Sequence, residues 1–357
     1  MKLALLSVTT RGAFLANTLA TEIRLSGDEA DCFEKQGRSA QCGAEAFDSL
    51  SELLVELWPR YDGFIFIMAT GIVVRVIAPH IVDKRQDPAV IVLDEQGIHA
   101  ISLLSGHLGQ ANCLASSVAK MIGAKPVITT ATDLAGKTAP DVLAVALQCK
   151  IEPFDRLKKI NAALAAGDTI IWQIDERLTL TEAYRAKAAE YAIELLPWQP
   201  KVSKDVAVKN VLISDRAMPC DEADLFLRPP ILAAGIGCRR GVPASEIIAA
   251  IEDACRSVGR SPACIAIMAS VDVKSTEKGL LEAAATLAAK TVFFSADELA
   301  QTVAKYNLKE SDFVRKQIGV GNICEAAVMK VSQEETLLVP RTRYPQITIA
   351  LAEVTSV

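Results

Sequence analysis

The stretch AISLLSGHLGQANCLASSVAKMIGAKPVITTA, residues 100–131, contains the pattern that decides the fold class. Apolar runs at 100–104 and 126–131 have the length and composition of buried strands, and the segment 111–122 between them has the apolar spacing of a helix. A strand, a helix and a second strand in this order are typical of a parallel β–α–β unit. Because such units place helices on both faces of a sheet, the sequence predicts an α/β protein.

The same alternation continues on both sides of this stretch. Toward the N-terminus we predict strands at 3–8, 64–69 and 89–93, helices at 14–23 and 49–58, and a polar loop at 24–44. The alternation resumes after the Pro-Pro pair at 229–230, where the predicted strands include 264–270, 291–295, 335–340 and 347–354.

Three domains follow from this distribution. We predict an N-terminal domain at 1–140 and a C-terminal domain at 229–357, each with three layers around a largely parallel sheet. Residues 141–228 have weak periodicity and are predicted to form a small middle domain that joins them. A chain of 357 residues is long enough for two or three domains.

The composition excludes several classes of protein. Hydrophobic residues make up 51% of the chain and charged residues 23%, which is typical of a globular protein. The net charge of −5 gives no basic surface for nucleic acid. No apolar run reaches the ~20 residues that cross a bilayer, and the N-terminal run reads as a first strand rather than a signal peptide. We therefore expect a cytoplasmic protein with no membrane partner.

Nine cysteines lie singly along the chain, at positions 32, 42, 113, 149, 220, 238, 255, 264 and 324. An odd number without a C-x-x-C pair fits neither a disulfide framework nor a structural zinc site. The chain also has no H-E-x-x-H, Walker or G-x-S-x-G motif. We predict reduced thiols and no protein-bound metal.

Short turns rich in glycine or hydroxyl groups follow the predicted strands. They are TTRG (9–12), ATG (69–71), SGHLG (105–109), TTATD (129–133), GIGCRRG (235–241), SVDVKS (270–275) and GVGNICEA (319–326). The carboxyl ends of parallel strands share one edge of a sheet, so the turns of each sheet are expected to meet there. For any single loop we favour a tight turn as the explanation of its glycine, but seven such loops together predict N–H groups that bind a large anionic ligand.

Five side chains near these turns have chemistry of their own. His107 is suited to proton transfer, with an exposed helix-cap histidine as the alternative. Arg75, Arg239 and Arg240 present guanidinium groups suited to carboxylates or phosphates. The glycines of GIGCRRG suggest a dinucleotide site, but their G-x-G-x-x-x-G spacing departs from the fingerprint. Cys324 lies near a predicted helix start that would lower its pKa, but no cysteine-protease-like context surrounds it, and we favour a buried apolar role.

The first segment contains the stretches ATGIVVRVIAPHIVDKRQDPAVIVLDEQG (69–97), ISLLSGHLGQAN (101–112) and PVITTATD (126–133). These stretches resemble the CbiG family, the cobalt-precorrin-5A hydrolases of anaerobic cobalamin biosynthesis. In the last segment the stretches with this resemblance are GIGCRRG, ASVDVKSTEKGLLEAA (269–284), FSADEL (294–299) and GVGNICEAA (319–327), which are also similar to CobE-type proteins. The middle segment matches only by position.

The resemblance implies a substrate and a reaction. The substrate is a flat cobalt tetrapyrrole rimmed with acetate and propionate groups, and the reaction opens its ring A δ-lactone and expels the former C20 fragment as acetaldehyde. The product is cobalt-precorrin-5B. No further cofactor is implied because the substrate carries the cobalt, and other enzymes of the pathway are candidate partners.

From the chemistry of these residues, and not from the family resemblance, we assign proton transfer to His107 and oxyanion stabilisation to the N–H groups around Gly106 and Gly109. The substrate-binding residues are predicted to be Gly71, Arg75, Ser105, Gly106, Gly109, Asn112, Thr130, Gly237, Arg239, Arg240, Asp272, Lys274, Gly321 and Glu325. Two alternatives from other classes are a corrinoid-binding carrier without catalysis and a nicotinamide-dependent oxidoreductase built on GIGCRRG.

Overall fold

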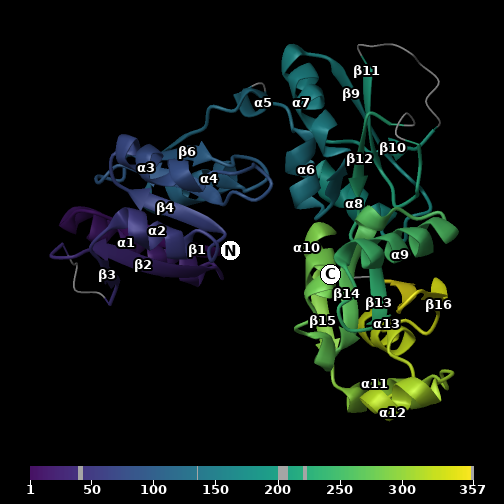
Figure 1. Ribbon diagram of the computed structural model, residues 1–357. Coiled ribbons are helices and arrows are strands. Elements are labelled where there is room, and N and C mark those ends of the chain that lie inside the picture. The colour runs from purple at the N-terminus through teal and green to yellow at the C-terminus, as the bar shows by residue number, and fades with distance from the viewer. Residues whose placement is uncertain (39–42, 135, 200–207, 220–222, 355–357) are drawn as a thin grey trace. The chain divides into compact units, whose positions relative to one another are not determined.

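The computed structural model describes residues 1–38, 43–134, 136–199, 208–219 and 223–354. It divides into two compact units, Met1–Val145 and Ala146–Val357 (Figure 1). Helices alternate with three largely parallel sheets in these residues, which confirms the predicted α/β class. No helix in the described part of the chain is long and apolar enough to span a bilayer.

The first unit is built on a seven-stranded sheet with the order β3-β2-β1-β4-β5-β6-β7. Its strands are β1 (Lys2–Ser7), β2 (Glu29–Lys35), β3 (Glu45–Phe47), β4 (Gly63–Ile67), β5 (Ala89–Leu93), β6 (His99–Leu104) and β7 (Lys125–Val127). Strands β1 to β5 run parallel, whereas β6 pairs antiparallel with β5 and carries β7 with it. The last two strands therefore point opposite to the rest of the sheet.

A tight hairpin between β5 and β6 causes this reversal. The Asp94 carboxylate accepts the backbone N–H groups of Gln96, Ile98 and His99, and Gly97 adopts a left-handed φ of 66°. Such an Asx turn with a left-handed glycine turns the chain back on itself without a crossover helix.

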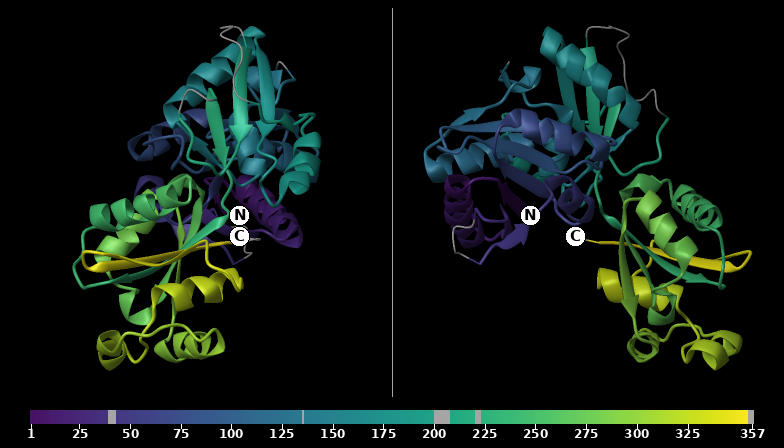
Figure 2. Two further views of the ribbon diagram at one scale, coloured as in Figure 1. Left: turned by 90° about the vertical axis from the view of Figure 1, so that its right-hand side faces the viewer. Right: turned by 60° about the vertical axis from the view of Figure 1, so that its left-hand side comes forward.

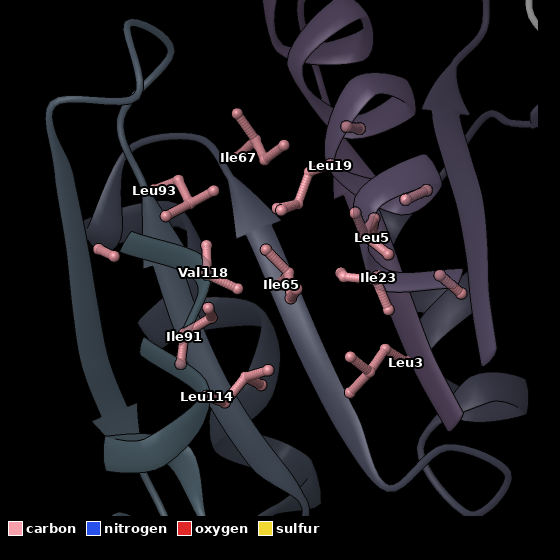
Figure 3. Close-up of a cluster of buried hydrophobic side chains, with 14 of the residues drawn as sticks. Leu3, Leu5, Leu19, Ile23, Ile65, Ile67, Ile91, Leu93, Leu114 and Val118 are labelled. Atoms are coloured by element: carbon pink, nitrogen blue, oxygen red, sulfur yellow. The ribbon is translucent and has the colours of Figure 1, made fainter. Parts of the chain in front are cut away.

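Helices cover both faces of this sheet. On one face, α1 (Thr10–Leu25) and α4 (Ala111–Ile122) bury apolar side chains against β1, β4 and β5 (Figure 3). On the other face, α2 (Leu50–Leu57) and α3 (Thr70–Ile77) pack against the alternate residues of the same strands. The short helices η1 (Ala78–His80), α5 (Ala131–Leu134) and α6 (Pro140–Ala146) complete the unit.

The second unit begins with a five-stranded sheet of order β10-β9-β11-β12-β8. Its strands are β8 (Lys150–Glu152), β9 (Thr169–Ile174), β10 (Leu196–Pro197), β11 (Val208–Ile213) and β12 (Leu225–Arg228). The helices in this region are η2 (Phe154–Arg156), α7 (Leu157–Ala166) and α8 (Thr181–Ala189). The weakly periodic middle segment thus contains a regular sheet with very short outer strands.

The C-terminal sheet has the order β15-β14-β13-β17-β16. Its strands are β13 (Leu232–Cys238), β14 (Ile265–Val271), β15 (Lys290–Phe294), β16 (Val339–Tyr344) and β17 (Ile347–Glu353). Strands β13, β14 and β15 run parallel, and the yellow strands β16 and β17 of Figure 2 form an antiparallel hairpin beside β13.

The helices of this region are η3 (Pro262–Cys264), η4 (Asp272–Lys274), α9 (Ala244–Ser257), α10 (Lys278–Thr286), α11 (Ala296–Lys305), α12 (Asp312–Ile318) and α13 (Cys324–Ser332). Helix α13 lies directly on β13, because a Cβ atom built on Gly235 would overlap the carbonyl oxygen of Cys324. Glycine at this strand position therefore allows close contact between helix and strand.

Candidate functional site

The predicted site residues of the first unit lie at two opposite edges of its sheet. Gly71 and Arg75 belong to α3, which follows the carboxyl end of β4. Ser105 follows β6, which runs the other way, so its turn lies beside Ala89 at the start of β5. The expectation that all these turns share one edge is wrong, because the β5–β6 hairpin reverses the last two strands.

Arg75 is placed on an exposed helix surface. Its Nη1 donates a hydrogen bond to the carbonyl oxygen of Gly71 within the same helix, at 3.0 Å. The remaining predicted residues of this unit gather at the other edge. They are Ser105, Gly106, His107, Gly109, Asn112 and Thr130.

His107 is held between two carboxylates. Its Nδ1 lies 3.1 Å from Oδ1 of Asp141, and its Nε2 lies 2.9 Å from Oδ2 of Asp133. The side chain of His107 is only 9% exposed and that of Asp141 only 5%, whereas Asp133 is 36% exposed. The exposed helix-cap histidine considered above is therefore not what the structure has.

The two carboxylates change the protonation of the ring. Burial alone would lower the pKa of His107, but the hydrogen bonds and charges of Asp141 and Asp133 outweigh it and raise the pKa from 6.5 to about 8. At neutral pH the ring is thus an imidazolium with both N–H groups donated to carboxylates.

Asn112 links this cluster to the neighbouring strands. Its Nδ2 donates to Oγ1 of Thr130 at 3.0 Å and to Oδ2 of Asp133 at 3.1 Å, and its Oδ1 accepts from Oγ of Ser102 at 2.7 Å. A Cβ on Gly106 would lie 2.8 Å from Oδ1 of Asn112. Glycine at 106 therefore leaves room for this amide.

The turn itself has an unusual backbone. Ser105 and Gln110, which flank it, adopt left-handed φ values of 58° and 69° although neither is glycine. The Ser105 hydroxyl is buried and has no hydrogen-bond partner among the residues that the structure describes. Such conformations cost energy and often occur at functional sites.

The second group of predicted residues surrounds a cavity of about 990 Å³ in the C-terminal region. Five of them line it: Gly237, Arg239, Arg240, Lys274 and Gly321. The cavity lies beside the carboxyl end of β13, the turn after β14, the start of α13 and the β16–β17 hairpin. Parallel strand ends gather here as the sequence predicts.

Cationic side chains dominate the polar part of this wall. Arg341 and Arg343 join Arg239, Arg240 and Lys274, so five cations line one cavity. Within the described ranges, none of the four guanidinium groups has a carboxylate partner within ion-pair distance. Unpaired guanidinium groups around a cavity favour a ligand with several carboxylates or phosphates.

Among the residues that the structure describes, Lys274 is the one cation of this set with a carboxylate partner. Its Nζ lies 3.0 Å from Oε2 of Glu277, whose Oε1 accepts the backbone N–H of Gly241 at 2.7 Å. The N–H of Gly241 and the ammonium of Lys274 hold the pKa of Glu277 below its usual range. This ion pair ties the GIGCRRG turn to the turn after β14.

Asp272 and Glu325, also predicted as binding residues, lie outside the cavity lining. Asp272 is exposed, and its Oδ1 accepts the N–H of Val273 at 2.7 Å. Glu325 pairs with Asn322 and accepts the backbone N–H of Arg341 at 2.9 Å. Glu325 therefore fixes the strand that presents Arg341 to the cavity.

Arg341 and Arg343 are the residues that the sequence reasoning missed. The strand was predicted at 335–340, whereas β16 begins at Val339 and ends at Tyr344. Two arginines two positions apart in a strand point to the same face. The alternation of residues in VPRTRY could have indicated that both arginines share one face. The strand was predicted to end at residue 340, so both arginines were left outside it.

Two other readings of these turns do not fit. Gly235 and Gly237 lie inside β13, and α9 begins only at Ala244, so GIGCRRG is not the strand-to-helix turn of a dinucleotide site. Cys324 is 1% exposed, and burial raises its pKa to about 11 instead of the lowering that a helix start suggests. Its thiol is a buried apolar group.

Comparison with known proteins agrees with this architecture. Three family profiles match the chain in order: "Cobalamin synthesis G N-terminal" at residues 52–133, "Cobalamin biosynthesis central region" at 138–229 and "Cobalamin synthesis G C-terminus" at 232–352. The cobalt-precorrin-5A hydrolase of Salmonella typhimurium is 33% identical over 98% of this chain and 97% of its own length. The chain belongs to the CbiG family.

Two further relatives extend the comparison. The cobalt-precorrin-5A hydrolase of Priestia megaterium is 29% identical over 98% of this CbiG chain and 94% of its own length. Protein CobE of a Sinorhizobium species is 32% identical over 34% of this chain and 79% of its own length. The family resemblance read from the sequence is thereby confirmed.

The two clusters lie within separate parts of the CbiG match. His107, Asn112, Thr130 and Asp133 fall within the N-terminal profile, and the five cations of the cavity fall within the C-terminal profile. The middle sheet lies within the central region.

Proposed function

We propose that this chain is a cobalt-precorrin-5A hydrolase. It opens the ring A δ-lactone of its substrate and releases the two-carbon fragment as acetaldehyde, leaving cobalt-precorrin-5B. The single structural observation that carries this function is the cavity of about 990 Å³ lined by five cationic side chains. Full-length similarity to two relatives named for this activity supports it.

The cavity matches the chemistry of the substrate rim. Acetate and propionate groups around a tetrapyrrole are carboxylates, and a guanidinium binds a carboxylate through two parallel hydrogen bonds. We assign rim binding to Arg239, Arg240, Arg341 and Arg343 of this wall. Cobalt enters with the substrate, so the proposal needs no resident metal or organic cofactor.

The reaction balances with water as the only co-reactant. The oxygen of water adds to the lactone carbonyl carbon, and the acyl–oxygen bond breaks. The released alkoxide becomes the carbonyl of acetaldehyde as its carbon–carbon bond to the macrocycle breaks, and the electron pair passes into the conjugated ring. The macrocycle then gains a proton, so water supplies one hydroxyl to the new carboxyl and one proton to the ring.

We assign proton transfer in this reaction to the cluster around His107, and stabilisation of the carbonyl oxyanion to the N–H groups around Gly106 and Gly109. Both glycines belong to the turn flanked by the left-handed residues Ser105 and Gln110. Loss of one oxyanion donor costs about 100-fold or more in rate.

We place the protein in the cytoplasm with the other cobalamin-pathway enzymes as partners. Seven cysteines in the described part of the chain carry free thiols, which supports a reducing compartment. Cys42 and Cys220 lie outside the described residues.

Anaerobic incubation with cobalt-precorrin-5A tests the function. The enzyme should release many equivalents of trapped acetaldehyde per chain. A protein that binds the substrate stoichiometrically and releases no acetaldehyde is a carrier, and the proposal is then wrong.

A further inference from the structure

We propose that Asp133 is the general base of the hydrolysis and that His107 is its positioning residue. His107 is itself held by its hydrogen bond to the buried Asp141. The assignment rests on the proposed function, because it concerns the water that attacks the lactone. It deepens that proposal by naming the proton acceptor and by giving His107 a different task.

The hydrogen bonds of the His107 ring decide its protonation. A neutral imidazole has one N–H and one lone pair, so it can donate to only one carboxylate. Both ring nitrogens of His107 lie within 3.1 Å of a carboxylate oxygen, and both must therefore carry protons. An imidazolium has no lone pair to accept a proton from water.

Exposure separates the two carboxylates. The Asp141 side chain is 5% exposed and contacts Nδ1, on the buried side of the ring, whereas Asp133 is 36% exposed. His107 itself is 9% exposed. Of the three ionisable groups, Asp133 alone is substantially open to a substrate and its water.

Asp133 is oriented through one of its two oxygens. Its Oδ2 accepts from Nε2 of His107 at 2.9 Å and from Nδ2 of Asn112 at 3.1 Å. Its Oδ1 accepts no hydrogen bond from any residue within the described ranges. A carboxylate fixed through one oxygen, with the other available, has the geometry of a general base.

The proton balance is simple. Asp133 Oδ1 takes a proton from water as the water oxygen bonds to the lactone carbonyl carbon. When the carbon–carbon bond breaks and the macrocycle receives the electron pair, the same proton leaves Asp133 for the macrocycle. The carboxylate is thereby restored, and no oxidant or reductant is needed.

This arrangement predicts the direction of the pH dependence. The charged groups that act on the ring are Asp141 from α6 and Asp133 from α5, while α4 contributes the neutral Asn112 and Cys113. Burial and the Asp133 charge raise the pKa of Cys113, so its thiol stays neutral. Because the His107 pKa is about 8, the positioning imidazolium disappears as pH rises through that value.

The test is steady-state acetaldehyde release by the full chain from about pH 6 to about pH 9.5. Wild-type kcat should fall as pH rises through about 8. Asp133→Asn should lower kcat by about 100-fold or more with KM changed less than about threefold. His107→Gln should lose about 10-fold to 100-fold in kcat and lose the fall in kcat near pH 8. His99→Gln, at an exposed histidine of β6, is the matched control and should behave as wild type.

Two results would overturn the assignment, and neither depends on the other. One is a wild-type kcat that rises through about pH 8, since His107 would then act as a neutral base. The other is a folded Asp133→Asn protein that keeps turnover within about threefold of wild type. If Asp133→Asn does not fold, the pH profile of wild-type kcat still tests the assignment. A wild-type chain that releases no acetaldehyde refutes the proposed function itself, which is a distinguishable outcome.

Discussion

The N-terminal sheet and the C-terminal sheet carry similar glycine-rich turns but place them differently relative to one another. In the first, reversal of β6 sends Gly71 and His107 to opposite edges. In the second, three strands run parallel, and the turns after β13 and β14 meet at one cavity with Gly321. Strand direction, more than glycine content, therefore decides which turn residues lie close together.

The glycines also differ in what they make room for. Gly235 permits α13 to touch β13, and Gly106 leaves space for the Asn112 amide. Outside its own helix backbone, a Cβ built on Gly71 would meet one atom of the described residues within 4 Å, the flexible Nη1 of Arg75 at 3.4 Å. Close approach of protein to protein thus explains two of these glycines without any ligand.

The largest effect on stability is expected at Gly235. Gly235→Ala forces α13 away from the backbone of β13, and overpacking of this kind costs about 3 kcal/mol of the free energy of unfolding. Urea unfolding followed by circular dichroism measures it. Gly71→Ala is the matched control and should change the free energy of unfolding by less than about 1 kcal/mol. Equal effects at the two glycines would break the comparison.

A second expected effect separates the arginines of the two regions. Arg341→Ala with Arg343→Ala should weaken binding of uroporphyrin, a polycarboxylate macrocycle, by about 100-fold, because charge-assisted hydrogen bonds contribute about 1.5–3 kcal/mol each. Coproporphyrin, with fewer carboxylates, should bind the wild type more weakly. Fluorescence titration gives both dissociation constants.

Arg75→Ala is the control for this binding experiment. Arg75 lies on an exposed helix surface in the other unit and bonds to its own helix. We expect less than about a threefold change in affinity. If the double variant binds uroporphyrin as tightly as the Arg75 variant, the cavity is not a carboxylate site.

The smallest expected effect is on local stability, which should depend on pH in opposite directions around His107 and around Glu277. The pKa of His107 is raised from 6.5 to about 8, so its contribution of about 2 kcal/mol is present below pH 6.5 and lost as pH rises through about 8. The pKa of Glu277 is lowered from 4.5, so its contribution is present above pH 4.5 and lost as pH falls below it.

Hydrogen exchange of the amides in α4 and α9 reports the two regions separately. His107→Gln should remove the alkaline loss of protection in α4, and Glu277→Gln should remove the acid loss in α9. Alkaline loss that persists in the His107 variant would show that another group causes it.

The sequence predicted the parts of the fold with strong periodicity. The segments 111–122 and 89–93 are helix and strand as expected. Residues 24–44 were predicted as loop, but β2 lies at Glu29–Lys35. The prediction missed this strand because its sequence, EADCFEK, mixes charged residues with few apolar ones. Ala30 and Cys32 are buried against β1 and helix α1 on one face of the sheet, and Phe33 packs near Leu54 and Tyr61 on the other face. This burial is a tertiary effect that local periodicity does not reveal.

The sequence indicated only part of the candidate site, because contacts between residues far apart in the chain leave no local pattern. Arg239 and Arg240 follow a long apolar strand, and the structure places both in the lining of the cavity. Asp133 and Asp141 lie 26 and 34 residues from His107, so no local spacing indicates that they meet its ring. Arg341 and Arg343 depended on the register of a hairpin that the turn at Gln346, with a left-handed φ of 61°, places beside β13.

Hydrolysis of the lactone by water is the central step of the proposed reaction, and oxygen-18 labelling tests it most directly. Cobalt-precorrin-5A is converted anaerobically by the chain in oxygen-18-labelled water, and the mass of the macrocyclic product is measured by mass spectrometry. We expect one labelled oxygen in the new carboxyl group of cobalt-precorrin-5B. An unlabelled macrocycle formed together with acetaldehyde would contradict the account, because the carboxyl oxygen would then not come from water.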